Sequence, residues 1–189
     1  MVGSMGRIAV HEFISLDGVF EDPSWTFQFG FDPAMGETLA GITGGASAIL
    51  LGRRTFEMFA PAWRDRTVED DPGAPFFNDT TKHVVGEQEP SEEWGPLARL
   101  GGYDPARIQA LKDETEGTIY VSGSGQLVRG LLADGLVDEL HLFVYPIALG
   151  SGQRLFADGA GPTTLALLAS DVYANGVLHL SYGPAERQA

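Results

Sequence analysis

The stretch ASAILLGRRT, at residues 46–55, predicts a strand that turns directly into a helix. The segment 46–51 is short and mostly apolar, which is typical of strands that are buried on both faces of a sheet. Gly52 ends the strand, and Arg53 opens a helix that we expect to reach Phe59 before Pro61 stops it. A strand–turn–helix unit of this kind indicates an α/β fold.

The same pattern returns in TIYVSGSGQLVRGLLA, at residues 118–133. Residues 118–122 predict a strand, a glycine-serine turn follows, and residues 126–133 predict a helix. The other predicted elements of this part of the chain are a strand at 7–15, a helix at 33–42, a weak strand at 82–85 and a helix at 105–114. The segments 64–81 and 87–102 are polar and contain Gly and Pro, which predicts loops.

The end of the chain has a different pattern, with three predicted strands at 137–145, 165–173 and 177–182. Asn175 and Gly176 separate the last two strands, and this pair is typical of a type I′ hairpin turn. Successive βα units followed by strands predict a mixed, mostly parallel sheet, flanked by helices and closed by an antiparallel hairpin. We expect one domain over residues 1–189, with residues 1–6 as a tail.

The composition excludes several classes of function. The formal net charge of −14 opposes binding to nucleic acid or to an anionic membrane surface. The chain has no cysteine, which excludes disulfides, thiolate metal sites and thiol catalysis. No apolar run is long enough for a membrane helix and no signal peptide is visible, so we expect a cytoplasmic protein.

Arg53 and Arg54 stand at the start of a helix, where the backbone already carries partial positive charge. A phosphate would compensate this arrangement by accepting backbone N–H groups, guanidinium groups and the Thr55 hydroxyl together. Gly52 would let such a ligand approach the backbone closely. The alternative is that the arginines pair with nearby acids, such as Glu57 one helical turn away.

The second turn, Ser122–Gly125, has the glycine content of an anion-binding turn before a helix. The dinucleotide fingerprint fails because its third glycine position holds Val128, and no Gly-Lys-Ser/Thr follows for a P-loop. A plain tight turn with Ser124 as N-cap is the alternative. Two such turns at the carboxyl ends of strands in one sheet favour a ligand crevice.

Five ordered motifs give the chain a resemblance to a known family. They are SLDG at 15–18, LGRRTFE at 51–57, VSGSG at 121–125, GLVDEL at 135–140 and PIALGSG at 146–152, with Leu155-Phe156 after them. This set resembles the reductase domain of bacterial riboflavin biosynthesis and its stand-alone relatives, within the dihydrofolate-reductase-like superfamily.

The resemblance implies a dihydrofolate-reductase-like three-layer fold that binds NADPH and reduces a small heterocyclic or carbonyl substrate, similar to a pyrimidine or pterin. It also implies a homodimer formed through the late strands around Asp138 and Glu139. The cofactor-binding residues that it implies are Asp17, Gly18, Leu51, Gly52, Arg53, Arg54, Thr55, Ser122, Gly123, Ser124, Gly125, Gln126, Leu127, Leu149 and Gly150. Among these, Arg53 and Arg54 would hold the 2′-phosphate, and Asp17 and Gly18 lie in the loop that closes over the nicotinamide.

The substrate side is less defined by the sequence. Asp17 is the candidate proton donor, although Asp before Gly18 is also a common turn residue. Trp25, Phe29 and Asp32 are the candidate substrate pocket, with packing in the core as the alternative for the aromatic rings.

The histidines at positions 11, 83, 141 and 179 lack metal-ligand spacing, so we expect no metal. Besides a reductase, a nucleotide- or phosphate-binding module without turnover and a structural dimerisation domain fit the same pattern.

Overall fold

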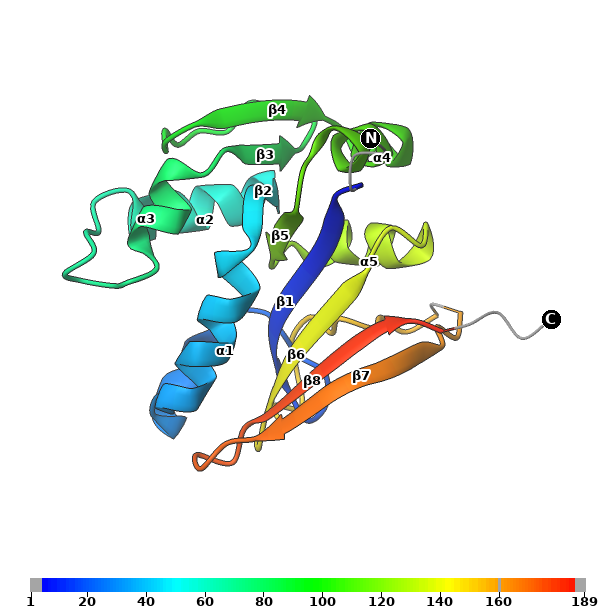
Figure 1. The fold of residues 1–189 in the computed structure, drawn as a ribbon. Coiled ribbons are helices and arrows are strands. Elements are labelled where there is room, and N and C mark those ends of the chain that lie inside the picture. The colour runs from blue at the N-terminus through cyan, green and yellow to red at the C-terminus, as the bar shows by residue number, and fades with distance from the viewer. Residues whose placement is uncertain (1–4, 160, 186–189) are drawn as a thin grey trace.

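Eight strands form one sheet in the computed structural model, which describes residues 5–159 and 161–185. The order across the sheet is β4-β3-β2-β5-β1-β6-β8-β7 (Figure 1). The strands are β1 Arg7–Ser15, β2 Ala46–Gly52, β3 Lys82–Val85, β4 Leu97–Gly101, β5 Thr118–Ser122, β6 Glu139–Tyr145, β7 Leu165–Val172 and β8 Leu178–Pro184. In this order the strands from β4 across to β6 run parallel to one another. Strand β8 is antiparallel to both of its neighbours, β6 and β7. This confirms the predicted mixed sheet and its antiparallel C-terminal hairpin.

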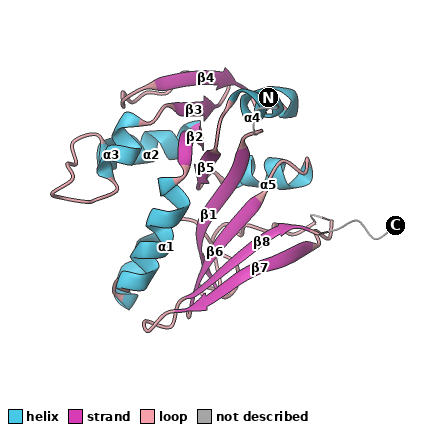
Figure 2. Ribbon diagram, in the orientation of Figure 1, coloured by secondary structure: helices cyan, strands magenta, loops and turns pink. Residues whose placement is uncertain are grey.

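Helices cover both faces of the sheet and make the fold three-layered (Figure 2). They are the 3-10 helix η1 Pro23–Phe29 and the α-helices α1 Pro33–Gly44, α2 Arg53–Trp63, α3 Ala74–Asp79, α4 Pro105–Glu114 and α5 Gly125–Ala133. Ile108 of α4 and Leu131 of α5 pack with Ile8 and Val10 of β1. Met35, Phe56 and Phe77 of the first three α-helices belong to two other apolar clusters. Because strand residues alternate in direction, the clusters lie on opposite faces of the sheet.

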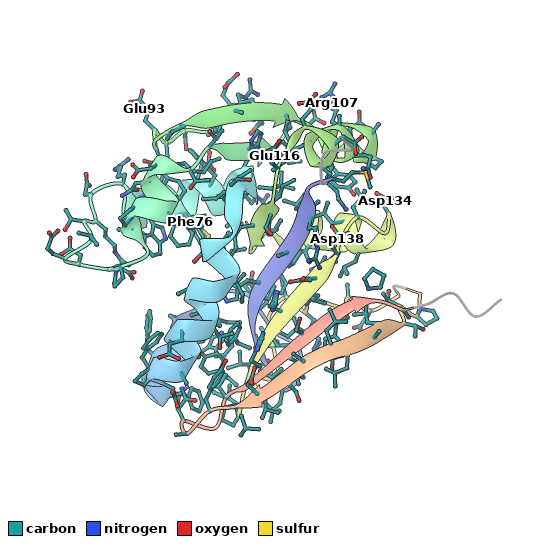
Figure 3. The ribbon with its side chains drawn as sticks, in the orientation of Figure 1. Phe76, Glu93, Arg107, Glu116, Asp134 and Asp138 are labelled. Carbon is teal, nitrogen blue, oxygen red and sulfur yellow. The ribbon has the colours of Figure 1, made fainter. Side chains whose placement is uncertain are left out.

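Charged side chains lie mainly on the outside, as Glu93, Arg107, Glu116 and Asp134 show in Figure 3. Asp138 is different, because its carboxylate accepts the Ile8 amide at 2.7 Å and the Lys112 Nζ at 2.6 Å. This ion pair ties the start of β1 to α4 and to the chain entering β6. No helix in the described ranges combines the length and apolar character needed to cross a lipid bilayer.

Two segments predicted as loops contain regular structure. Helix α3 lies within 64–81, with Pro75 in its first turn, where a missing N–H costs no helical hydrogen bond. Strand β4 lies within 87–102 and forms an edge of the sheet beside β3. Helix α2 continues past Pro61 to Trp63, and the Arg64 amide still donates to the Ala60 carbonyl at 3.0 Å. The prolines were therefore misread as breakers where they occupy the first or last turn of a helix.

The C-terminal hairpin is confirmed, but its predicted turn type is wrong. A type I′ turn needs positive φ at both central residues, and here only Gly176 has it, at 85°. The Tyr173 amide donates to the Val177 carbonyl and the Gly176 amide donates to the Tyr173 carbonyl, so the loop has three residues.

The predicted tail, residues 1–6, contains one residue that packs against the domain. Gly6 is buried, and its amide donates to the Lys112 carbonyl at 2.8 Å. Residues 1–4 of that tail lie outside the described residues.

Candidate functional site

The two strand-to-helix turns meet at one edge of the sheet. The first turn is Gly52–Thr55 and the second turn is Ser122–Gly125. Strands β2 and β5 are parallel neighbours, so Gly52 and Ser122 end on the same side. The Ser124 Oγ accepts the Gly52 amide at 2.8 Å and donates to the Thr55 Oγ1 at 2.6 Å. Thr55 acts as acceptor in that bond, so its own hydroxyl hydrogen is available to another group. The structure thus brings together the two turns that the sequence selected.

Glycine is required in the first turn by close packing. A Cβ on Gly52 would lie 2.5 Å from the Ser124 Oγ, closer than real Cβ atoms approach. In the second turn the requirement is conformational, since Gly123 has φ 65° and Ser124 has φ 66°. Two successive residues with positive φ lead the chain from β5 into α5, a conformation that glycine adopts readily at position 123.

Helix α5 begins without a side-chain cap. Ser124 is its N-cap residue, but the side chain makes no cap hydrogen bond and instead accepts the Gly52 amide. The first amides of α5 therefore keep their positive partial charge for another acceptor. Gln126 is exposed beside them, whereas Leu51 and Leu127 are buried, so only the backbone of these two leucines can contact a ligand.

The two adjacent arginines have different surroundings. The Arg53 Nη1 donates to both carboxylate oxygens of Glu57 at 2.8 Å, which is the pairing that the sequence allowed as an alternative. Glu57 also accepts the Ser91 amide at 2.9 Å, and these donors, Ser91 first, lower the pKa of its carboxyl. Arg54 is exposed and makes no ion pair within the described ranges. Arg54 is therefore the guanidinium more readily available to an anion.

Asp17 joins the loop after β1 to the loop after β6. Its carboxylate accepts the Ser15 hydroxyl at 2.6 Å, the Leu149 amide at 3.0 Å and the Gly150 amide at 2.8 Å. These donors, Ser15 first, lower the pKa of Asp17 to about 2. An ionised carboxylate has no proton to donate, so the contacts favour a role in holding the loops over proton donation.

A hollow of about 560 Å³ lies between these two loops. Trp25, Leu149 and Val19 supply apolar lining, while Glu21 and Asp22 supply carboxylates. Phe29 does not line this hollow; both Trp25 and Phe29 pack edge-on against Tyr145 at 5.5 Å between ring centroids.

Asp32 is engaged elsewhere than in the hollow. One carboxylate oxygen caps α1 by accepting the Ala34 amide at 2.8 Å. The other accepts the Ala174 amide in the β7–β8 turn, also at 2.8 Å. Both carboxylate oxygens of Asp32 therefore have structural hydrogen bonds, which explain its position without a contact to a substrate.

Sequence reasoning missed two buried polar residues of β1, His11 and Glu12. The His11 Nδ1 lies 2.9 Å from the Tyr120 hydroxyl, and burial, together with His141 and His179, lowers its pKa to about 3. Burial raises the pKa of Glu12 to about 8. Their signal was present in RIAVHEFIS, where a histidine and a glutamate interrupt an otherwise apolar strand.

Comparison with known proteins gives a consistent result. The family model for the RibD C-terminal domain matches residues 104–179. The chain is 25% identical over 183 residues to the uncharacterized protein YyaP of Bacillus subtilis (strain 168), covering 93% of this chain and 94% of that protein.

Solved structures share the fold at low identity. A putative riboflavin biosynthesis protein from Shewanella sp. PV-4 superposes with a TM-score of 0.76 at 18% identity, covering 96% of this chain and 100% of that one. A dihydrofolate reductase from Enterococcus faecalis, complexed with NADP(H) and RAB-propyl, superposes with a TM-score of 0.61 at 15% identity, covering 97% and 99%. The predicted resemblance is thereby confirmed: this chain is similar to the riboflavin-biosynthesis reductase domain and has the dihydrofolate-reductase-like fold.

Proposed function

We propose that this protein is an NADPH-dependent reductase that transfers a hydride to a C=N or C=O bond of a small heterocyclic or carbonyl substrate. The observation that carries the proposal is the junction of the two turns through Ser124, which places an uncapped helix start beside a basic one. Backbone amides and guanidinium groups together suit a ligand with several phosphates. NADPH is such a ligand, and the reductase-like fold is consistent with it.

In this proposal the residues of the turns divide the phosphates between them. The amides from Ser122 to Leu127 and the Thr55 hydroxyl bind the pyrophosphate, and the first turn binds the 2′-phosphate. Arg54 contributes its charge directly, while Arg53 is shared with Glu57. The side chains fit such a group because Arg54 is exposed and the start of α5 lacks a cap.

The remaining residues orient the reacting ring and exclude water. NADPH, when bound, supplies the hydride. Asp17 holds the Gly18 loop against Leu149 and Gly150, which gives the nicotinamide a fixed wall. The hollow beside Trp25 receives a flat substrate, and its aromatic wall favours stacking. The proton that completes the reduction comes from water or from a group other than ionised Asp17.

A homodimer through the late strands is part of the same proposal. Leu167, Leu168 and Val172 of β7 are 57%, 56% and 79% exposed, which is unusual for apolar residues of one strand. A second copy of the chain would cover them. Sedimentation at micromolar concentration tests this point, and a monomer there would remove the homodimer from the proposal.

Fluorescence titration with NADPH tests the proposed function. We expect saturable binding at micromolar concentration, followed by NADPH oxidation when a panel of heterocyclic and carbonyl compounds is added. No binding at high micromolar NADPH would refute the reductase. Binding without oxidation across the panel would favour a nucleotide-binding module of the same fold.

A further inference from the structure

Glu57 is held in place by donors from two separate segments of the chain. From its own helix, α2, the Arg53 Nη1 donates to both carboxylate oxygens at 2.8 Å. From the loop after β3, the Ser91 amide and hydroxyl donate to the Glu57 Oε1 at 2.9 Å and 3.0 Å. These donors, the Ser91 amide first, lower the pKa of the carboxyl, so Glu57 is a fixed negative charge at neutral pH.

Arg53 is confined as closely as its partner. A Cβ on Gly86, directly after β3, would lie 2.8 Å from the Arg53 Cβ and 3.5 Å from its Cδ, so the arginine stem packs against that backbone. The Arg53 and Glu57 side chains are only 26% and 19% exposed. Salt therefore screens this pair less than an ion pair on the open surface.

The pair balances the charge that Arg53 brings to the first turn. The Arg53 Nε and Nη2 make no hydrogen bond within the described part of the chain, so a ligand can still reach these atoms. An anion that does so also meets the Glu57 carboxylate, whose repulsion offsets the attraction of the guanidinium. Arg54 is exposed and has no ion pair in the described ranges, so it is the arginine of the two that keeps its charge for a ligand.

We propose that Glu57 is a specificity-determining residue: by neutralising Arg53, it leaves recognition of the 2′-phosphate to Arg54 and lets the protein accept NADH as well as NADPH. This inference rests on the proposed function. NADH lacks the 2′-phosphate, so it forgoes only the attraction that Arg54 supplies to that group. Two uncompensated arginines would bind the 2′-phosphate more strongly and widen the difference in affinity between the two cofactors.

The test is the affinity of Glu57→Gln for both cofactors, measured by fluorescence titration of the full chain. Glutamine keeps an acceptor for Ser91 and removes the negative charge. We expect the Kd for NADPH to fall at least about fivefold, and the Kd for NADH to change less than about twofold. Glu57 with a purely structural role would give weaker binding of both cofactors or an unchanged ratio of the two Kd values. Either result would overturn the inference.

Glu92→Gln is the matched control. Glu92 forms an ion pair of 2.7 Å with Arg64, which directly follows α2, whereas Arg53 is the first residue of that helix. The control thus removes the same charge from the same kind of pair, about 16 Å along the helix from the first turn. We expect it to keep both wild-type Kd values. The same gain in NADPH affinity in the control would assign the effect to net charge and not to Glu57.

A double variant, Arg53→Gln with Glu57→Gln, tests the balance of charge directly. Because the two charges offset each other in the wild type, removing both leaves the Kd for NADPH within about threefold of the wild-type value. A larger loss of affinity would show that Arg53 binds the phosphate in spite of Glu57, and it would contradict the inference.

The wild-type protein supplies a measurement that needs no variant to fold. With Arg54 as the uncompensated arginine, we expect NADPH to bind about tenfold more tightly than NADH. A preference of about a hundredfold or more would overturn the inference and leave the reductase intact. Absence of binding by either cofactor would refute the proposed function itself.

Discussion

The first turn and the second turn differ in charge and in backbone geometry. The first turn has charge: two arginines, one paired with Glu57 and one exposed. The second turn has no charged residue from Ser122 to Gln126, and it offers a left-handed backbone over the buried carboxyl of Glu12. Ser124 joins them by bonding to both Gly52 and Thr55.

Under the proposed function, this difference corresponds to two separate ways of binding phosphate. Guanidinium groups attract anions over a distance and tolerate movement, and salt weakens them. Backbone amides at a helix start depend on fixed geometry and on the packing that maintains it. We therefore expect changes in packing to damage the second turn most and changes in charge to affect the first turn most.

The largest expected effect comes from Gly125→Ala, which disturbs the packing under the second turn. The new Cβ would lie 2.1 Å from the Phe20 Cζ, so the ring has to move. We expect the free energy of unfolding to fall by about 2–3 kcal/mol, measured by denaturant unfolding. Gly41→Ala, in a helix with free space around the new Cβ, is the control and does not destabilise. If Gly125→Ala leaves the free energy of unfolding unchanged, both in the wild type and in a Phe20→Ala background, the packing argument is wrong.

The second effect concerns pH and belongs to the second turn alone. Unfolded Glu12 loses its proton near 4.5, whereas folded Glu12 keeps it until about 8, so rising pH favours the unfolded state in this range. His11 acts oppositely: its unfolded form gains a proton below 6.5 and its folded form only near 3, so acid favours unfolding.

From about pH 6.5 to pH 8 Glu12 acts without His11, and we expect wild-type stability to fall by about 2 kcal/mol. Denaturant unfolding across this range measures the decrease. In Glu12→Gln the decrease is smaller; an unchanged slope would show that another group causes it.

A smaller effect is expected from Ser124→Ala, which separates the two turns. The substitution leaves the Gly52 amide without its acceptor and removes the bond to Thr55. We expect a loss of about 1–2 kcal/mol in unfolding free energy and several-fold weaker NADPH binding. Thr163→Ala, which also removes a hydroxyl, lies at an exposed position before β7; it serves as the control and changes neither quantity measurably. Matching results for the two variants would mean that the turns are independent.

The arginines have the smallest expected effect on stability, and their effect on affinity distinguishes the first turn from the second. Arg54→Gln should raise the Kd for NADPH about tenfold and leave that for NADH nearly unchanged, because only NADPH has the 2′-phosphate. Arg53→Gln also breaks the Glu57 pair, so it lowers stability as well as affinity. Fluorescence titration with both cofactors measures this, with exposed Arg107→Gln as control. Equal losses for NADPH and NADH in Arg54→Gln would exclude 2′-phosphate recognition by this residue.

The elements that were predicted correctly are those whose signal is local. Apolar strands such as 46–51 and 118–122, each ending at a turn and followed by a helix, are recognisable from neighbouring residues alone. Strand β4 was missed because its stability comes from pairing with β3, which the local sequence does not report. Helix α3 was missed because Pro75 was interpreted without knowing its position in the helix.

The candidate site shows the same division. The motifs identified both turns and the loops that hold Asp17, Leu149 and Gly150. They did not show that Asp17 is saturated with donors or that Asp32 ties α1 to the β7–β8 turn. These bonds join residues that are more than a hundred positions apart, and only folding brings them together.

By itself the sequence determined the class of fold and the two turns, since glycine and helix-start signals act through local backbone geometry. The tertiary structure decided how these parts are used: Arg53 is paired, Arg54 is exposed, and Ser124 joins the turns. It also converted Glu12 from one acid among 26 Asp and Glu into a buried neutral group beside Gly123. Burial and distant partners set the charge of a side chain, and both arise only when the sheet and its helices pack together.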